Sequence, residues 1–242
     1  RRISSAASDV YKRQAQYTIR IMLNHSAAPM HADNMLKHVT AGNYNMTHYH
    51  RIIDDFMVQG GDFENNDGTG GYAADWYGYC NGQAMADASN CANNERTVPD
   101  EADNGLQHRS CMVSMAKTSQ PNTAGSQFFL MPDDIDHHAW LDGVHTVFGE
   151  VTDGCEHVTT ISEVETDSDD RPVVPVLSPA LTMTSPPTKA SPSPTTRETE
   201  PPRPDVASPV ETLKSPEFPN EDVPDETCVC VREEGEKGAR IR

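Results

Sequence analysis

The sequence predicts a mainly β fold, a closed antiparallel barrel capped by two α-helices. Two observations lead to this fold class. Several short segments are apolar and compatible with strands, whereas only two segments carry apolar residues at helical spacing. Many short strands with few helices are typical of antiparallel barrels, in which the sheet closes on itself and the helices cover its ends.

The first elements lie between residues 19 and 59. Residues 19–23 (IRIML) alternate well enough to form a strand. Pro29 stands where a helix can begin, because its fixed φ suits the first helical position, and Met35 and Val39 continue at helical spacing. Residues 52–59 are apolar and β-compatible and end at a pair of glycines. These segments predict a strand, a helix and a second strand.

The remaining elements follow a long polar stretch. Residues 64–104 are rich in Asn, Asp, Gly and Ala and have weak periodicity. We interpret them as one long loop, and loops of such length are usually functional or stapled. Three further strands are expected at residues 112–116, 127–131 and 147–151, and Gly154 precedes a second helical pattern.

Composition divides the chain into three parts. Hydrophobic residues make up only 36% of the chain, and 14 of its 18 prolines follow residue 165. A segment that poor in large apolar groups cannot offset the entropy of ordering its backbone. We therefore expect a folded domain at residues 15–165 and a Pro/Ser/Thr-rich disordered tail at residues 166–242. Residues 1–14 (RRISSAASDVYKRQ) resemble translated adapter sequence and are left out of the fold prediction.

The formal net charge of −18 is concentrated in the predicted domain, where residues 15–165 carry −15. A surface this acidic repels a phosphate backbone and an anionic membrane surface, so we expect neither nucleic acid nor lipid as a partner. The chain has no run of 18 or more apolar residues, and no membrane span is expected. In the simplest interpretation the charge maintains solubility.

Three sequence blocks carry the functional signal. Residues 50–62 read HRIIDDFMVQGGD, residues 114–129 begin with SMA and end with PNTAGSQFF, and residues 140–149 read WLDGVHTVFG. In this order and spacing they resemble the signatures FHR-I-FM-QGGD, SMA…PNTNGSQFF and WLDGKHVVFG of cyclophilin-type peptidyl-prolyl cis/trans isomerases. Together the blocks cover nearly all of residues 17–165, so the resemblance is far more specific than a single QGGD.

The resemblance implies an eight-stranded closed barrel with two capping helices. In the family this barrel begins with a strand before the one that we expect at residues 18–23. Here that position falls in the suspected adapter segment. A missing first strand would leave an unpaired edge, with a loss of stability and a tendency to associate.

The chemistry of X–Pro rotation can be stated without reference to a family. Rotation removes partial double-bond character against a barrier of about 18–20 kcal/mol, but no bond is made or cut. The reaction therefore needs no nucleophile, metal or cofactor, and none is predicted. It is helped by a donor that withdraws the lone pair of the proline nitrogen, and by a pocket that fits the twisted state better than either planar state. Arg51 suits the first role because its guanidinium is always charged.

The resemblance assigns the other site residues one by one. Gln59, which can hold a substrate carbonyl or brace Arg51, and Phe56, an apolar wall, join Arg51 in the expected catalytic set. The residues expected to bind substrate are His50, Met57, Ala116 (through its backbone), Gln127, Phe129, Trp140, Leu141 and His145. The alternative is that the aromatic and Met side chains are barrel core. For Phe128 we prefer core, because strand neighbours face opposite sides.

Two departures from the family pattern concern the far wall of the groove. Residues 116–121 (AKTSQP) are one residue longer than the common form, and Lys117 stands where Asn is usual. The loop at residues 72–104 is also longer than in compact family members and borders the expected place of neighbouring substrate residues. The sequence therefore does not predict which X–Pro sites are preferred.

Four cysteines lie in the predicted domain, an even number that permits three pairings. A bridge between Cys80 and Cys91 would staple the long loop, and Cys111 and Cys155 could form a second. The alternative is four free thiols in a reducing compartment. Disulfides would place the domain outside the cytoplasm, so an extracytoplasmic or secreted location is slightly favoured.

Two histidine pairs raise the question of a metal site. His48 with His50, and His137 with His138, lack a third and fourth ligand at a recognisable spacing, so we expect surface or groove histidines.

Two function classes stay open from the sequence. One is a monomeric isomerase that acts on proline-containing polypeptides as a folding helper. For it the resemblance implies cyclosporin as a competing ligand, since the family includes cyclosporin receptors and Trp140, associated there with tight binding, is present. The other is a non-catalytic module that holds prolyl peptides as a chaperone or scaffold. The complete set of catalytic and groove residues favours the isomerase, since a pure binder does not need all of them.

Overall fold

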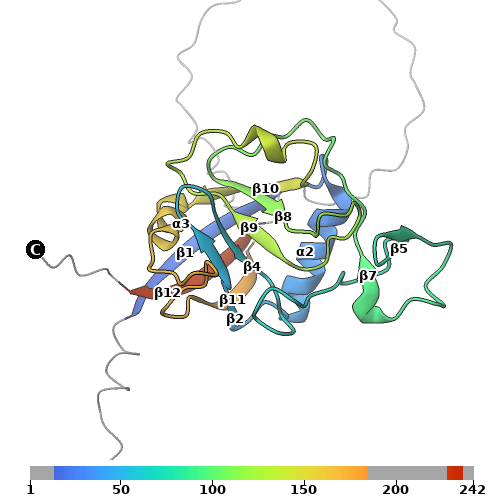
Figure 1. Cartoon of the computed structure of the whole chain (residues 1–242), viewed down its shortest axis with the longest axis horizontal. Helices are drawn as coiled ribbons and strands as arrows, with labels where there is room; N and C mark the ends of the chain where they lie inside the picture. Colours follow the sequence, from blue (N-terminus) through green and yellow to red (C-terminus); the bar gives the residue numbers. More distant parts are fainter. Residues whose placement is uncertain (1–13, 185–227, 237–242) are drawn as a thin grey trace, which may run out of the picture. The chain divides into compact units, whose positions relative to one another are not determined.

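The computed structural model describes residues 14–184 and 228–236 of the chain, so all but Gln14 of the suspected adapter segment lies outside the described residues. The described residues form a mainly β fold with two α-helices, as the sequence predicts, and Figure 1 shows how the elements are arranged. Neither of these helices has the length and apolar character that crossing a bilayer requires.

Nine strands form one curled antiparallel sheet, in the order β2-β11-β12-β1-β10-β8-β9-β4-β3. The strands are β1 (Gln14–Leu23), β2 (Thr47–His48), β3 (Arg51–Ile53), β4 (Met57–Gly60), β8 (Met112–Met115), β9 (Phe128–Leu130), β10 (Val147–Asp153), β11 (Leu177–Thr184) and β12 (Cys228–Glu236). The two ends of this order, β2 and β3, are joined in the chain by Tyr49 and His50 alone. One short segment therefore connects the two edges of the sheet.

The two helices are α2 (Pro29–Ala41) and α3 (Cys155–Ser162). Pro29 occupies the first turn of α2, where a missing backbone N–H costs nothing. The helix ends at Gly42, whose φ of 73° is left-handed and lets its N–H bond back to the last turn. Both helices lay apolar side chains on the sheet, with Met35 of α2 and Val158 of α3 fully buried.

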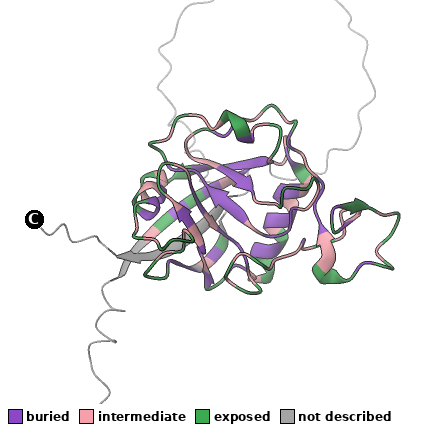
Figure 2. Ribbon diagram, in the orientation of Figure 1, coloured by how far each residue is buried: buried purple, intermediate pink, exposed green. Residues whose placement is uncertain are grey.

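The main core lies between the sheet and the helices, where Figure 2 shows buried residues along the strands and on the covered side of α2. Alternate residues of the strands enter it, as the period of two requires. Its inward-facing strand residues include Ile19, Ile21, Leu23, Ile52, Val58, Val113, Met115, Phe128, Leu130 and Phe148. Phe128 is thus core, as the sequence predicts.

The apolar run at residues 52–59 is a hairpin and not one strand. β3 and β4 pair with Ile52 opposite Val58, and the turn between them contains Asp55 with a φ of 56°. Asp tolerates this left-handed conformation better than most residues. Asp54 and Asp55 are exposed, so two polar residues interrupt a segment that otherwise looks like a continuous apolar strand.

The predicted long loop contains a small sheet of its own, in the order β6-β5-β7. Its elements are β5 (Tyr79–Cys80), β6 (Gln83–Ala84), the 3-10 helix η1 (Asn93–Glu95) and β7 (Arg96–Thr97). A disulfide joins Cys80 to Cys91 within this insertion. Figure 1 shows β5 and β7 outside the large sheet, beyond α2. Two-residue strands are too short to produce a periodic pattern, so the sequence could not predict them.

The expected disordered tail at residues 166–242 needs a correction where the structure describes it, because β11 and β12 of the large sheet come from it, while residues 185–227 and 237–242 lie outside the described residues. β12 lies between β1 and β11 and pairs with β1 from Gln14 opposite Glu236 to Met22 opposite Cys228. The place beside β1 that was expected to be empty is therefore filled by a strand from far along the chain. Proline-rich composition around both strands concealed them.

Candidate active site

Side chains of four neighbouring strands form one row on the outer face of the sheet. Arg51 of β3 lies opposite Gln59 of β4, Gln59 lies opposite Phe129 of β9, and Phe129 lies opposite Ser114 of β8. Directly opposite residues point to the same face, with Cβ atoms about 4.5–5.5 Å apart. Ile52, the next residue along β3, enters the main core instead. A cation, an amide and an aromatic ring are thus aligned on consecutive strands.

A second apolar cluster lies on this outer face, separate from the main core. Its buried members are Met57, Phe129, Met131 and Leu141. Partly buried Phe56 and Ala116 pack against it, so five of the predicted site residues meet here. Leu141 reaches the cluster from the 3-10 helix η2 (Ala139–Leu141). Met57 belongs to β4, Phe129 belongs to β9, and Met131 directly follows β9.

Arg51 remains accessible beside this cluster. Its side chain is 42% exposed, and its Nε lies 3.4 Å from Oδ2 of Asp170. Asp170 belongs to the turn that precedes β11, far from Arg51 in sequence. The sequence offered no signal for this partner, because Asp170 falls in the segment interpreted as a disordered tail.

Gln59 and Gln127 form a chain of amide hydrogen bonds next to Arg51. Nε2 of Gln59 donates to Oε1 of Gln127 at 3.0 Å. Nε2 of Gln127 donates in turn to the carbonyl oxygens of Gly68 at 2.9 Å and Gly70 at 2.7 Å. These bonds fix both amide groups, so the orientation of Gln59 depends on the backbone of the loop that follows β4.

Three aromatic rings form a rim above the cluster, with Phe56 and His138 half-buried and Trp140 exposed. The Phe56 and Trp140 rings lie 5.3 Å apart, and the Phe56 and His138 rings lie 5.2 Å apart, edge to face. Trp140 is 63% exposed although it is a large apolar side chain. An exposed tryptophan beside a buried apolar cluster is a common feature of binding surfaces.

His145 closes another side of the cluster. Its Nδ1 lies 3.0 Å from the carbonyl oxygen of Met115 and donates to it, and its ring meets Phe129 edge to face at 5.9 Å. Burial lowers the pKa of His145, and the nearby positive charge of Lys117 lowers it further, against the effect of the Met115 hydrogen bond. The ring is therefore neutral at pH 7, and Nε2 can accept a hydrogen bond.

One predicted residue, His50, lies away from the apolar cluster, and another, Ala116, lies at its edge. His50 is buried beneath Gly68, and burial lowers its pKa despite the nearby carboxylate of Asp62. Ala116 packs at the edge of the cluster, but its backbone N–H already donates to the carbonyl oxygen of Gln127 at 2.9 Å. A substrate contact through the Ala116 backbone must therefore use its carbonyl oxygen.

A buried polar network that the sequence did not indicate supports Phe129 from below. His108 stacks on the Phe129 ring at 6.0 Å, and its Nδ1 and Nε2 lie 2.9 Å from Oδ1 of Asp142 and 2.8 Å from Oγ of Ser114. Burial opposes ionisation of Asp142, but hydrogen bonds from His108 and His137 hold its pKa at about 2. A single histidine in a loop gives no sequence pattern from which such a network could be predicted.

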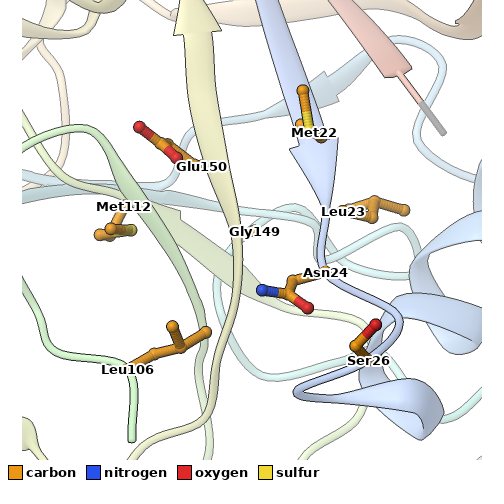
Figure 3. A pocket seen from close by; sticks show the side chains of 8 residues that line it. All are labelled: Met22, Leu23, Asn24, Ser26, Leu106, Met112, Gly149 and Glu150. Atoms are coloured by element: carbon orange, nitrogen blue, oxygen red, sulfur yellow. The ribbon is translucent and has the colours of Figure 1, made fainter. Parts of the chain in front are cut away.

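Two surface cavities lie outside the apolar cluster. One, of about 240 Å³, is lined by His48, Tyr49, His50, Asn66, Asp67, Arg171, Pro172 and Pro175. The other, of about 230 Å³, is lined by Met22, Leu23, Asn24, Ser26, Leu106, Met112, Gly149 and Glu150. Figure 3 shows Gly149 in the middle of the second lining, where β10 passes the end of β1. This cavity contains none of the predicted site residues.

Comparison with known proteins places this surface in a family context. The family described as "Cyclophilin type peptidyl-prolyl cis-trans isomerase/CLD" matches residues 10–178. Peptidyl-prolyl cis-trans isomerase-like 1 of Neurospora crassa is 35% identical over 160 residues, which cover 66% of this chain and 83% of that protein. Peptidyl-prolyl cis-trans isomerase 9 of Schizosaccharomyces pombe is 39% identical over 161 residues, 66% of this chain, but the chain spans only 22% of that relative's length.

Solved structures agree with the sequence relatives. A cyclophilin type peptidyl-prolyl cis-trans isomerase of Cryptosporidium parvum matches with a TM-score of 0.57 and 26% identity, over 72% of this chain and 100% of that one. A second crystal structure under the same protein name, in the presence of the dipeptide Ala-Pro, matches with a TM-score of 0.54 and 27% identity, over 68% and 92% of the two chains.

Proposed function

This chain belongs to the cyclophilin-type peptidyl-prolyl cis-trans isomerase family, and from this premise we propose that Arg51, Gln59 and the apolar cluster around Phe129 form its active centre. The protein is a peptidyl-prolyl cis-trans isomerase, which rotates X–Pro bonds in proline-containing polypeptides. The observation that carries the assignment of residues is the row Arg51–Gln59–Phe129 across three adjacent strands.

Arg51 acts on the proline nitrogen of the X–Pro amide. The C–N bond of this amide rotates and is not cleaved. In the planar amide this nitrogen shares its lone pair with the carbonyl, which produces the rotation barrier of about 18–20 kcal/mol. As the bond twists, the lone pair becomes available, and a guanidinium N–H can donate to it. The donor is preorganised and always charged, so it stabilises the twisted state more than either planar state.

The apolar cluster holds the proline ring while the peptide turns. Met57, Phe129 and Leu141 supply a buried apolar floor, and the half-buried Phe56 forms part of the aromatic rim. Gln59, held by Gln127, receives the neighbouring substrate backbone in a fixed orientation. One side of the substrate is thus anchored, and the X–Pro bond can rotate with little movement of the proline itself.

We also propose a ligand, an oligomeric state and a cellular compartment for this protein. The exposed Trp140 ring beside Phe56 offers cyclosporin, an apolar cyclic peptide, a contact over the groove. The −15 charge of residues 15–165 opposes self-association, which supports a monomer. Disulfides Cys80–Cys91 and Cys111–Cys155 support folding in an oxidising, extracytoplasmic compartment.

We also propose that the curled sheet closes as an eight-stranded barrel. β2 and β3 stand at opposite ends of the strand order, yet only Tyr49 and His50 separate them in the chain. If β2 and β3 are two halves of one bent strand, the nine short elements become eight strands. In that case the strand made of β2 and β3 pairs with β11 on one side and with β4 on the other, and the sheet closes.

Exchange spectroscopy by NMR on a short prolyl peptide tests the active centre. Arg51→Ala should lower the cis/trans exchange rate at saturating enzyme by about a hundredfold, the cost of losing one preorganised transition-state donor. Arg109→Ala, which removes an exposed arginine hydrogen-bonded to Gln107, is the matched control and should leave the rate unchanged. An Arg51→Ala variant with full exchange would contradict the assignment. Wild-type protein that binds the peptide without exchange would instead support the non-catalytic module.

A further inference from the structure

The turn before β11 is rigidly built around Asp167. Oδ1 of Asp167 accepts hydrogen bonds from the backbone N–H groups of Asp169 at 2.9 Å and Arg171 at 3.0 Å. The backbone N–H of Asp167 donates to the Arg171 carbonyl at 2.8 Å, and Thr166 bridges to Pro172 across the base. The turn is therefore a preformed platform, held by side-chain and backbone bonds.

Asp170 lies at the tip of this turn and makes two contacts with β3, one through its backbone and one through its side chain. Its carbonyl oxygen accepts a hydrogen bond from the N–H of Ile52 at 2.8 Å. Its carboxylate Oδ2 lies 3.4 Å from Nε of Arg51. The φ of Asp170 is 62°, a left-handed conformation that a non-glycine residue adopts at a cost, and here it aims the carboxylate at Arg51.

The atom of Arg51 that Asp170 contacts is informative. Nε lies on the inner side of the guanidinium, so a carboxylate there fixes the plane of the group and leaves the terminal NH₂ groups for other partners. Both side chains are about two-fifths exposed, 42% for Arg51 and 43% for Asp170. Water therefore screens the ion pair, and the guanidinium of Arg51 can still donate hydrogen bonds to another partner.

We propose that Asp170 is a positioning residue for the isomerase reaction, which holds the guanidinium plane of Arg51 toward the substrate amide through Nε. This inference rests on the catalytic role proposed for Arg51. Asp170 touches neither the substrate nor the turning bond, so its effect is on the fraction of time that Arg51 is correctly oriented. The turn that carries Asp170 thus becomes part of the active centre.

The test replaces the carboxylate and keeps the backbone. Asp170→Asn preserves the size of the side chain, and Asn also tolerates a left-handed φ, so the Ile52 hydrogen bond and the turn should persist. The expected result is a fall in kcat of about twofold to fivefold, the range of a half-exposed ion pair, with KM for the peptide unchanged. Asp169→Asn, an exposed neutralisation one residue earlier, is the matched control and should leave both constants unchanged.

Ionic strength gives a readout that a merely structural role would not produce. Raising salt from about 0.01 M to about 1 M shortens the Debye length from about 30 Å to about 3 Å and weakens the pair. The wild-type kcat should fall toward that of Asp170→Asn, while the variant itself should change little. Equal salt dependence in the two proteins, or a wild-type kcat in Asp170→Asn, would overturn the proposal.

A double-mutant cycle separates this proposal from the one on which it rests. In an Arg51→Ala background, Asp170→Asn should have no further effect on exchange. If Arg51→Ala is fully active, the catalytic role of Arg51 fails. If Arg51→Ala is inactive and Asp170→Asn reduces kcat equally in wild-type and in an Arg51→Lys background, the role of Asp170 through the Nε contact fails while that of Arg51 stands.

Discussion

The Nε2 group of Gln59 donates a hydrogen bond to Oε1 of Gln127 at 3.0 Å, which links the residue beside Arg51 to the backbone of the Gly68–Gly70 loop. Gln127→Met keeps the length of the side chain and removes all three amide contacts. Because Gln59 is then free to turn, kcat/KM should fall by about tenfold, with a loss of about 1–3 kcal/mol in unfolding free energy. NMR exchange and urea denaturation measure the two effects. A variant that loses stability but keeps full activity would show that the bond is structural alone.

Phe129, which we propose as the floor of the proline pocket, should respond differently to two substitutions. Phe129→Leu keeps an apolar residue at a site that is only 5% exposed and should raise KM with a modest loss of stability. Phe129→Ala should cost about 3–5 kcal/mol of unfolding free energy, because it leaves a cavity above His108. Thermal unfolding and peptide titration distinguish these outcomes. Unchanged peptide affinity in both variants would remove Phe129 from the binding surface.

Asp142 should contribute stability that acid removes. Its pKa in the folded protein is about 2, below the ordinary value of 3.8, because His108 and His137 donate to it. A depressed folded pKa means that the contribution is fully present above about pH 4 and is lost as the pH falls through about 2. The contribution at pH 7 is about 2 kcal/mol. Urea midpoints of the wild type and Asp142→Asn should therefore differ at pH 7 and converge near pH 2, whereas Asp136→Asn, an exposed control, should follow the wild type throughout.

The two disulfides should have separable effects. The Cys80–Cys91 bridge closes a separation of 11 residues inside the insertion, and Cys111–Cys155 closes one of 44 residues between the start of β8 and the start of α3. The chain-entropy relation gives about 3 and about 4 kcal/mol, respectively. Replacing Cys80 and Cys91 by Ser should lower amide-exchange protection within β5 and β7 and leave isomerase activity intact. The Cys111/Cys155 double serine variant should instead lower the global melting temperature.

β12 should be needed for the stability of the sheet. Val231 lies opposite Ile19 of β1 and Leu181 of β11, in the middle of two ladders. Val231→Pro removes a backbone donor at this position, and proline is not tolerated in central strands. Size-exclusion chromatography should then show association through the exposed edges, together with a lower melting temperature. Monomeric protein of wild-type stability would mean that β12 does not hold this place in solution.

The parts of the fold that sequence predicts are those with a long periodic pattern. α2 has a proline at its start, an apolar stripe and a glycine at its end, and it is found where expected. The hairpin β3–β4 was missed because only Asp54 and Asp55 interrupt its apolar run. β5, β6 and β7 are two residues each, too short for any period to appear.

Some site residues were predictable from the sequence and others were not. Met57, Phe129 and Leu141 were predicted by matching motifs, and they do meet in one cluster. The partner of Arg51 was not predictable, because Asp170 and Arg51 meet only through the folding of distant segments. His50 was expected to line the groove; its ring lies buried beneath Gly68, and a contact between His50 and the substrate stays a prediction.

The position of β12 also affects when the large sheet can be completed during synthesis. β1 is synthesised before every other described element and β12 after all of them, yet the two are neighbours. On the ribosome, β1 emerges long before the strand that fills the gap between it and β11. Until β12 is synthesised, the nascent chain therefore lacks the strand that pairs with both β1 and β11, and transiently exposed strand edges of this kind favour aggregation.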